Sequence, residues 1–327
     1  MIDYRLFKES DLKDVVKLWN KEVESEGFYK SFTEDGFRNH LLQHPEFSYE
    51  GTFVACDNGK IVGFVSAMVR HIEKSLPHCP GYLVAILVEK SYRKQGIGKQ
   101  LLTRASNYLK SLGKTKMLIG YTSTINWPWY IPHTEKHDHA GAPGVAINSE
   151  FYCYLINHGF EVVEEEDAFH ADLATYDIPE NVKNKIIKNE LNGYKIEIYD
   201  SNKHYGLEEF YTNIQSEPFE RVIRSNLKLT TPYPFFVVSH QGKIEGWTGA
   251  MWTEPSGRAH FDGIIIAPSV RGMGIGQSLF CMLGRYSKEH GSSFMTFFTG
   301  RNNPARYIYM GAGFKIIQSF ALMQKGI

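Results

Sequence analysis

An internal repeat constrains this chain most, because a sequence that repeats itself must fold the same unit twice. Residues 51–64 and 234–247 each read as an apolar strand, a tight turn with glycine and a second strand, which is typical of a β-hairpin. In each half a further strand, a glycine-rich basic segment and an amphipathic helix follow, and a Gly-Phe pair closes the pattern. The repeat predicts two copies of one unit.

The order of elements predicts the fold class. Each half opens with a strand and a helical stripe, at 2–19 and 194–214. The full order is then strand, helices, hairpin, strand, helix, strand, helix, strand. This order predicts an α+β fold with a mixed, mostly antiparallel sheet flanked by helices, present twice.

The two halves differ in length at one place. Arg93 and Gly159 are 66 positions apart, whereas Arg271 and Gly313 are 42 apart, so the first half carries 24 extra residues. The loop-forming composition of 125–147 indicates that the insertion lies there. The expected boundaries are a first domain at 1–175, a linker with a helix at 176–192, and a second domain at 193–327.

Composition restricts partners and compartment. Lys plus Arg and Asp plus Glu both number 36, so no bulk charge recruits nucleic acid or an anionic membrane. The longest near-continuous apolar stretch, Tyr82 to Val88, is far shorter than the ~20 residues that span a bilayer. The start of the chain shows no secretion signal. The four scattered cysteines form no Cys-x-x-Cys pair and suit a reducing compartment, so we expect a soluble, cytoplasmic protein.

The segment before the long helix of each half indicates anion binding. The two copies read Arg93-Lys94-Gln95-Gly96-Ile97-Gly98 and Arg271-Gly272-Met273-Gly274-Ile275-Gly276. Glycines let a backbone approach a ligand closely, and free N–H groups at a helix start favour anions, so a diphosphate is the natural ligand. A turn that merely connects strand to helix is the alternative, which two matching copies disfavour. Neither copy has the residues of a Walker loop or of a Rossmann fingerprint.

This arrangement resembles the GNAT superfamily of acyl-CoA-dependent N-acetyltransferases. The resemblance covers nearly the whole chain as two tandem GNAT units, similar to the arrangement of mycothiol synthase and other tandem members. It implies that the strand before each segment carries a bulge and splays from the next strand, so that pantetheine lies in the gap. It also implies acetyl-CoA as acyl donor, with its pyrophosphate held by the backbone amides of the segment. The implied cofactor-binding residues are Val88, Arg93, Gln95, Gly96, Ile97, Gly98 and Lys99 in the first half, and Ile266, Arg271, Gly272, Met273, Gly274, Ile275, Gly276, Gln277 and Asn303 in the second.

A tyrosine four residues before the Gly-Phe pair is the acid that the resemblance implies. In the family its hydroxyl protonates the leaving thiolate. The second half has Tyr309 at this place, whereas the first half has Leu155, with Tyr154 adjacent. The resemblance therefore implies that Tyr309 is catalytic; a helix aromatic packed in the core is the alternative.

A proton acceptor is also needed, because an amine with a pKa near 10 is mostly protonated at neutral pH. On the strand before the second segment, His260 and Asp262 point the same way by period-2 alternation. The matching strand 81–88 has no titratable base. We expect Asp262 to be the base, with His260 and Glu254 as further candidates and a backbone N–H at Ile266 or beside it for the oxyanion. A structural carboxylate is the open alternative.

Two other clusters leave alternatives open. The insertion collects His133, His137, Asp138 and His139, but their spacing matches no zinc site known to us, so no metal is expected. Its aromatic residues either form a wall over the acceptor or a contact surface. The charged residues of 217–224 either shape the acceptor pocket or are solvated.

Together these patterns predict an N-acetyltransferase that moves an acetyl group from acetyl-CoA to a primary amine by direct attack on the thioester. The intact second segment and Tyr309 favour the C-terminal domain as the catalytic one. A non-catalytic acyl-CoA-binding or scaffold protein built of two decayed units is the alternative. The expected partners are acetyl-CoA and an amine-bearing acceptor, with no nucleic acid and no membrane, and the chain is expected to be a monomer or homodimer.

Overall fold

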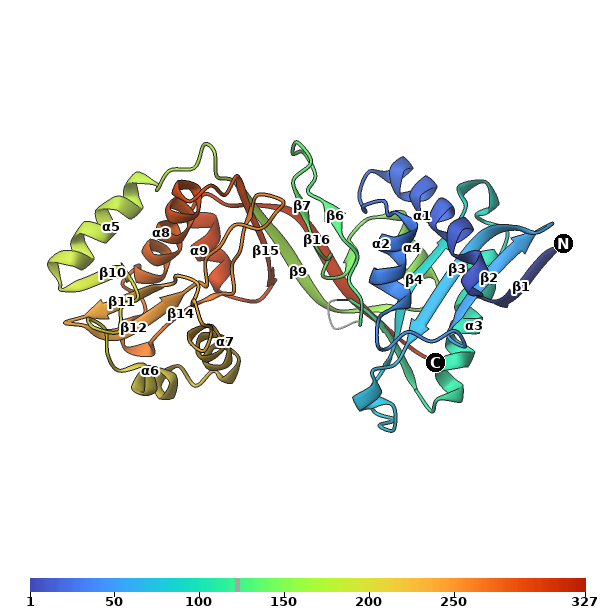
Figure 1. Cartoon of the computed structure of the whole chain (residues 1–327), viewed down its shortest axis with the longest axis horizontal. Helices are drawn as coiled ribbons and strands as arrows, with labels where there is room; N and C mark the ends of the chain where they lie inside the picture. The colour runs from blue at the N-terminus through green and yellow to red at the C-terminus, as the bar shows by residue number, and fades with distance from the viewer. Residues whose placement is uncertain (121–123) are drawn as a thin grey trace. The chain divides into compact units, whose positions relative to one another are not determined.

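The computed structural model describes residues 1–120 and 124–327 (Figure 1). The chain forms two compact units, one of Met1–Asp167 with Gln318–Ile327 and one of Ala168–Ile317. Each unit has a mostly antiparallel sheet with helices, so the predicted α+β class and its two tandem copies are confirmed. No helix in these described ranges has the length and apolar character that crossing a membrane requires.

The first unit has the element order that the sequence predicted, with a short hairpin in the insertion. Its elements are β1 (Ile2–Leu6), α1 (Leu12–Glu26), α2 (Glu34–Phe37), β2 (Thr52–Asp57), β3 (Lys60–Met68), β4 (Gly81–Val88), α3 (Ile97–Ser111), β5 (Lys116–Ile119), β6 (Trp129–Tyr130), β7 (Asp138–His139), β8 (Val145–Ala146), α4 (Glu150–Asn157) and the first part of β9 (Glu161–Asp172). Single-turn helices lie at Glu9–Asp11, His71–Glu73 and Lys90–Tyr92, and a π-helical turn at Arg38–Leu42.

The sheet of the first unit runs β1-β2-β3-β4-β5-β16, where β16 is Lys315–Gly326. Neighbours are antiparallel except for β4 and β5, which are parallel. One apolar cluster holds α1 and α2 against one face of this sheet, and a second holds α3 and α4 against the other. Helix α1 forms because its apolar residues recur at helical spacing, and it ends at Gly27 with φ 65°.

The second unit repeats the pattern without the insertion. Its elements are the end of β9, α5 (Glu180–Leu191), β10 (Tyr194–Ile198), α6 (Leu207–Ile214), α7 (Glu217–Leu227), β11 (Phe236–His240), β12 (Lys243–Thr248), β13 (Arg258–Ala259), β14 (Ile264–Ile266), α8 (Ile275–Glu289), β15 (Phe294–Gly300) and α9 (Ala305–Gly311), with a single helical turn at Pro268–Val270. Strands β10-β11-β12-β14 form one sheet, whereas β9, β15 and β13 neighbour one another in a different sheet.

The unit boundaries differ from the sequence-based ones in two places. Residues 318–327, the end of the second repeat, pair with β5 of the first unit, with Met323 opposite Ile119. Residues 168–192, placed by the sequence in the first domain and the linker, belong to the second unit, where 180–191 forms α5. The end of β16, the last strand of the second repeat, thus belongs to the first unit, and the end of β9, the last strand of the first repeat, belongs to the second. The sequence does not show this, because a strand has the same side-chain pattern whichever sheet it joins.

Candidate active site

Strand β4 of the first unit carries a bulge. Ser66 of β3 lies opposite Ala85, whereas the next residue, Ala67, lies opposite Leu83, so Val84 is the extra residue. The side chains agree, because Val84 and Ala85 both face the cluster of α1 while Leu83 faces the cluster of α3. The bulge that the resemblance implied is therefore present in this unit, and it re-aims the end of β4.

Beyond the bulge, β4 separates from β5. The two parallel strands pair at Gly81 with Met117 and at Tyr82 with Leu118, and in the described part of the chain their pairing stops there. Among the residues that the structure describes, no strand pairs with the β5-facing edge of 83–88. An open edge of unpaired backbone N–H and C=O groups can accept an extended ligand as an added strand.

A cavity of about 800 Å³ adjoins this open edge. Residues of β4, α1, the start of α3, the insertion and α4 line it, including Leu83–Val88, Gly96, Trp127 and Tyr154. Its volume falls in the range of ligand sites, which are about 300–1,000 Å³. By contrast, a cavity beside α5 and β10 in the second unit measures about 10 Å³.

The glycine-rich segment of the first unit forms an open cradle at the start of α3. Gly96 precedes the helix with φ 83°, and a Cβ there would meet no atom within 4 Å. The first helical bond runs from the N–H of Gln100 to the carbonyl of Gly96, so the N–H groups of the residues between them have no acceptor within the helix. Lys94, Gly98 and Lys99 line the cavity beside Gly96. The geometry suits a diphosphate.

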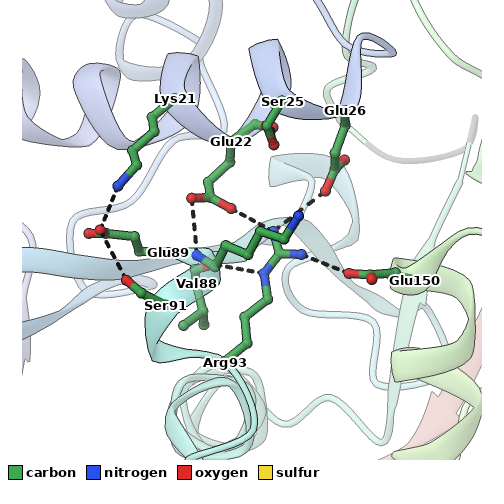
Figure 2. A network of polar contacts seen from close by, with 10 residues as sticks. Lys21, Glu22, Ser25, Glu26, Val88, Glu89, Ser91, Arg93 and Glu150 are labelled. Atoms are coloured by element: carbon green, nitrogen blue, oxygen red, sulfur yellow. Dashed lines mark hydrogen bonds and ion pairs between the residues drawn. The ribbon is translucent and has the colours of Figure 1, made fainter.

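Arg93, the first residue of this segment, joins three elements rather than pointing freely at a ligand (Figure 2). Its Nε donates to the carbonyl of Val88 at 3.0 Å, and its two terminal nitrogens donate to Glu150 at 2.8 Å and to Glu22 at 2.6 Å. Glu26 lies 3.4 Å away. Arg93 therefore ties α1, the end of β4 and the start of α4 together around the cradle.

Glu89 is the buried partner of the same region, and its side chain is only 5% exposed. Burial by itself would raise the pKa of this carboxyl, but hydrogen bonds from Lys21 and Lys60 outweigh burial, so the pKa is lowered. Figure 2 shows the bonds that Lys21 and Ser91 donate to Glu89. These charges hold α1 against the end of β4.

Tyr154 of α4 lines the cavity, and its hydroxyl oxygen is buried beside the cradle. Within the described residues this oxygen has no hydrogen-bond partner. It would lie 3.2 Å from a Cβ at Gly98, so it adjoins the cradle, and its ring packs 4.2 Å from that of His158. Burial raises the pKa of Tyr154, so the hydroxyl stays protonated.

The second unit has the same backbone conformation at the start of α8, but a lysine side chain lies over its glycine. Gly274 precedes α8 with φ 76°, and Arg271 donates to the carbonyl of Ile266 at 3.2 Å, as Arg93 does to Val88. Here, however, Lys185 of α5 lies over the glycine, and a Cβ at Gly274 would be 3.0 Å from its Cδ.

Other side chains complete the cover over this second cradle. Gln277 accepts a hydrogen bond from Lys185 at 2.7 Å, and Asn189 donates to the carbonyl of Met273 at 3.5 Å. A Cβ at Gly276 would be 3.1 Å from Ile308, just as one at the matching Gly98 would be 3.2 Å from Tyr154, so this contact is common to both cradles. Side chains of the unit itself thus occupy the surroundings of this segment.

Tyr309 and Asn303 lie in structural settings. Tyr309 is 5% exposed and packs among the rings of Phe297 at 4.6 Å and Phe280 at 4.8 Å, and burial raises its pKa. Asn303 caps the start of α9, since its Oδ1 accepts the N–H of Ala305 at 3.0 Å. Tyr309 thus lies within an aromatic cluster, and its catalytic role stays a prediction.

The structure does bring together the predicted base and its two neighbours. His260 bonds to Asp262 through Nε2 at 2.8 Å and approaches Glu254 through Nδ1 at 3.3 Å. Its ring stacks on Trp252 at 3.4 Å. Arg258 in turn donates to Glu254 and not to Asp262, with which the structural alternative would pair it.

The insertion serves both the cavity and the core. Trp127 lines the cavity, whereas Trp129 is fully buried and packs on Phe28 at 5.2 Å. Lys30 pairs with Asp138, one of the residues weighed for zinc. In the portion of the chain described by the structure, no cluster of three or more His, Cys, Asp and Glu side chains is placed to hold a metal ion.

Sequence reasoning missed the residues that α1 contributes. Glu22 is 5% exposed although it is charged. A signal was available, because Glu22 continues the apolar stripe of Val15 and Trp19 at helical spacing, and a charge in such a stripe indicates a buried ion pair. Trp127 and Tyr154 gave no such signal, since no local pattern shows which aromatic residue faces a cavity.

Known proteins are similar to this chain in sequence and in fold. A curated relative, the N-terminal acetyltransferase A complex catalytic subunit NAA10 of Arabidopsis thaliana, is 26% identical over 148 residues. The match covers 45% of this chain and 62% of the relative, so the chain spans less than two thirds of that protein.

Solved structures share the fold over the whole chain. A GCN5-related glucosamine N-acetyltransferase region of a fungal multi-domain GH3 β-N-acetylglucosaminidase has a TM-score of 0.64 at 17% identity, covering 99% of this chain and 38% of that one. A GCN5-related N-acetyltransferase from Sphaerobacter thermophilus has a TM-score of 0.58 at 14% identity, covering 99% and 95%. A tandem GNAT protein from the clavulanic acid biosynthesis pathway also has 0.58, at 12% identity, covering 100% and 98%.

The family described as acetyltransferase (GNAT) matches twice, at residues 13–130 and 200–314. One match falls in each repeat, and together they span more than half of the chain. The chain therefore belongs to the acetyltransferase (GNAT) family, as a tandem member with two copies of the fold.

Proposed function

We propose that this protein transfers an acetyl group from acetyl-CoA to a primary amine, and that the first unit performs the transfer. The observation that carries the proposal is one cavity of about 800 Å³. It joins the cradle at the start of α3 with the open edge of β4, and Tyr154 lines it.

Each part of the cavity suits one part of the donor. The N–H groups at the start of α3, with Lys94 and Lys99 beside them, would hold the diphosphate. The open edge of 83–88 would pair with the pantetheine arm, and its backbone N–H groups would polarise the thioester carbonyl. The protonated hydroxyl of Tyr154 would donate its proton to the departing thiolate.

A carboxylate of α1 is our candidate for accepting the proton of the amine. Both Glu22 and Glu26 line the cavity. Glu22 already accepts from the N–H of Lys90 at 3.1 Å and from Arg93 at 2.6 Å. Glu26 has the longer contact of 3.4 Å with Arg93 and a side chain that is 47% exposed, so it is freer to meet an acceptor.

Replacing Glu26 by Gln is expected to lower kcat at least about tenfold, because a positioned base contributes roughly 10²–10⁴-fold. Initial rates at saturating acetyl-CoA measure this. Glu24→Gln is the matched control, since Glu24 is exposed on the same helix and does not line the cavity. Equal rates in both variants and the wild type would remove Glu26 from the proposal.

The second unit is the other candidate centre. Sequence reasoning favours Tyr309 and Asp262 there, and the contact between His260 and Asp262 would suit a proton acceptor. Because Lys185 lies over the cradle of this unit, we infer that the second unit no longer binds acetyl-CoA. A scaffold without activity stays the alternative to both centres.

The release of free CoA thiol from acetyl-CoA tests the proposed function. We would offer peptides with a free N-terminus first, because the curated relative is an N-terminal acetyltransferase subunit, and then amino acids, amino sugars and polyamines. Amine-dependent release supports an enzyme, and no release with any of them supports a scaffold. The four cysteines carry no disulfide, in keeping with the cytoplasmic location that we propose.

A further inference from the structure

The backbone carbonyl of Val84 lies at the bulge of β4, so a hydrogen bond to it holds the bulge in place. Val84 is the extra residue between two regular pairs of β3 and β4. It is 3% exposed, so its backbone oxygen needs a partner within the protein. Because side chains alternate along a strand, the position of the bulge decides which way every later residue of β4 faces.

That partner is Trp127 of the insertion. Its indole Nε1 donates to the carbonyl of Val84 at 2.8 Å, and both atoms are buried. The Trp127 ring is 8% exposed and is held by the rings of Trp19 at 4.2 Å and His40 at 5.1 Å. His40 also bonds to the carbonyl of Asn126, which fixes the chain next to Trp127. The donor is thus rigidly placed.

The second unit has a different contact near the matching place, one residue further along its strand. Where its strand breaks between β13 and β14, the carbonyl of Gly263 accepts a bond of 2.9 Å from the hydroxyl of Thr248 on the neighbouring strand. No insertion is present in this repeat. The long-range indole contact therefore belongs to the unit that has the large cavity.

We propose that Trp127 is a positioning residue for acetyl transfer in the first unit. Through the carbonyl of Val84 it fixes the bulge, and the bulge aims those N–H groups of 85–88 that do not bond to β3 at the thioester carbonyl. This inference rests on the proposed function. It gives the extra residues of the first repeat a role, because the insertion carries the donor that sets the geometry of β4.

Trp127→Phe tests the inference, because it keeps an aromatic ring and removes the N–H. We expect kcat to fall about 10- to 100-fold, since loss of one oxyanion donor costs roughly 10²–10³-fold and here the donors are only misaligned. The Kd for CoA, which lacks the thioester carbonyl, should change less than about threefold. Hydrogen exchange of the peptide 81–88 should become faster.

Trp129→Phe is the matched control, because Trp129 is buried on the same insertion and does not line the cavity. It should leave kcat and the exchange of 81–88 close to wild type. Equal losses in both variants, or a loss in Trp127→Phe explained by a weaker Kd for CoA, would overturn the positioning role. A wild-type chain without acetyl transfer would overturn the proposed function itself, and the two failures are thus separable.

Discussion

Replacing Gly96 by Asp is expected to weaken acetyl-CoA binding about 100-fold or more. The new carboxylate would stand at the start of α3, where the diphosphate is proposed to bind, and two like charges about 4 Å apart repel by roughly 4 kcal/mol in a partly buried setting. The fold should tolerate the change, because Asp adopts positive φ more readily than most residues and open space surrounds this position. Titration calorimetry with acetyl-CoA measures the effect.

Three further variants make this experiment decisive. Gly96→Asn has the same shape without the charge, so it should weaken binding much less. Gly274→Asp and Gly274→Asn place the same pair at the matching position of the second unit, where φ is 76° instead of 83°. These two should leave the affinity unchanged. If Asp weakens binding more than Asn at Gly274 but not at Gly96, acetyl-CoA binds in the second unit, as the sequence favoured.

Replacing Tyr154 by Phe is expected to lower kcat roughly 10²–10³-fold, while the Kd for CoA stays within about threefold. The reason is that the variant keeps the ring against Gly98 and His158 but removes the only proton that the residue can donate. Tyr152→Phe is the control on the same helix, because Tyr152 does not line the cavity. A weaker Kd with an unchanged kcat would make Tyr154 a binding residue instead.

The pH dependence gives a second check on Tyr154. Burial raises its pKa above the ordinary value of 10, so the hydroxyl loses its proton only above that raised value. The wild-type kcat should therefore not decline through pH 10 because of this group.

The variant Tyr309→Phe tests the centre that the sequence favoured. A large loss of kcat in this variant, with no loss in Tyr154→Phe, would place the chemistry in the second unit.

Much of the fold could be predicted because it depends on local patterns. The hairpin signature, the stripe of α1 and the glycine before each long helix all act within a few residues, and each formed as expected. The bulge also followed from the resemblance and lies at Val84. The sequence-based boundaries differ from the observed units because strand exchange changes which sheet a strand joins without changing its pattern.

The candidate site could be predicted only in part. Both glycine-rich segments begin a helix as expected, but nothing in the segments shows that Lys185 covers one of them. Likewise, Tyr309 has the family's spacing to its Gly-Phe pair, yet it packs within an aromatic cluster. Tyr154, one position away from that spacing in its own repeat, lies in the cavity instead.

The amino-acid sequence by itself determined that this chain is a duplicated α+β unit of the GNAT family with two glycine-rich turns, each before a long helix, because hairpins, helix starts and glycine turns are set by neighbouring residues. Only the tertiary structure shows that the first copy has a cavity of ligand size, since a cavity depends on side chains from distant segments such as α1 and the insertion. A cavity is the space that packing leaves unfilled, and packing brings together residues whose separation along the chain carries no signal.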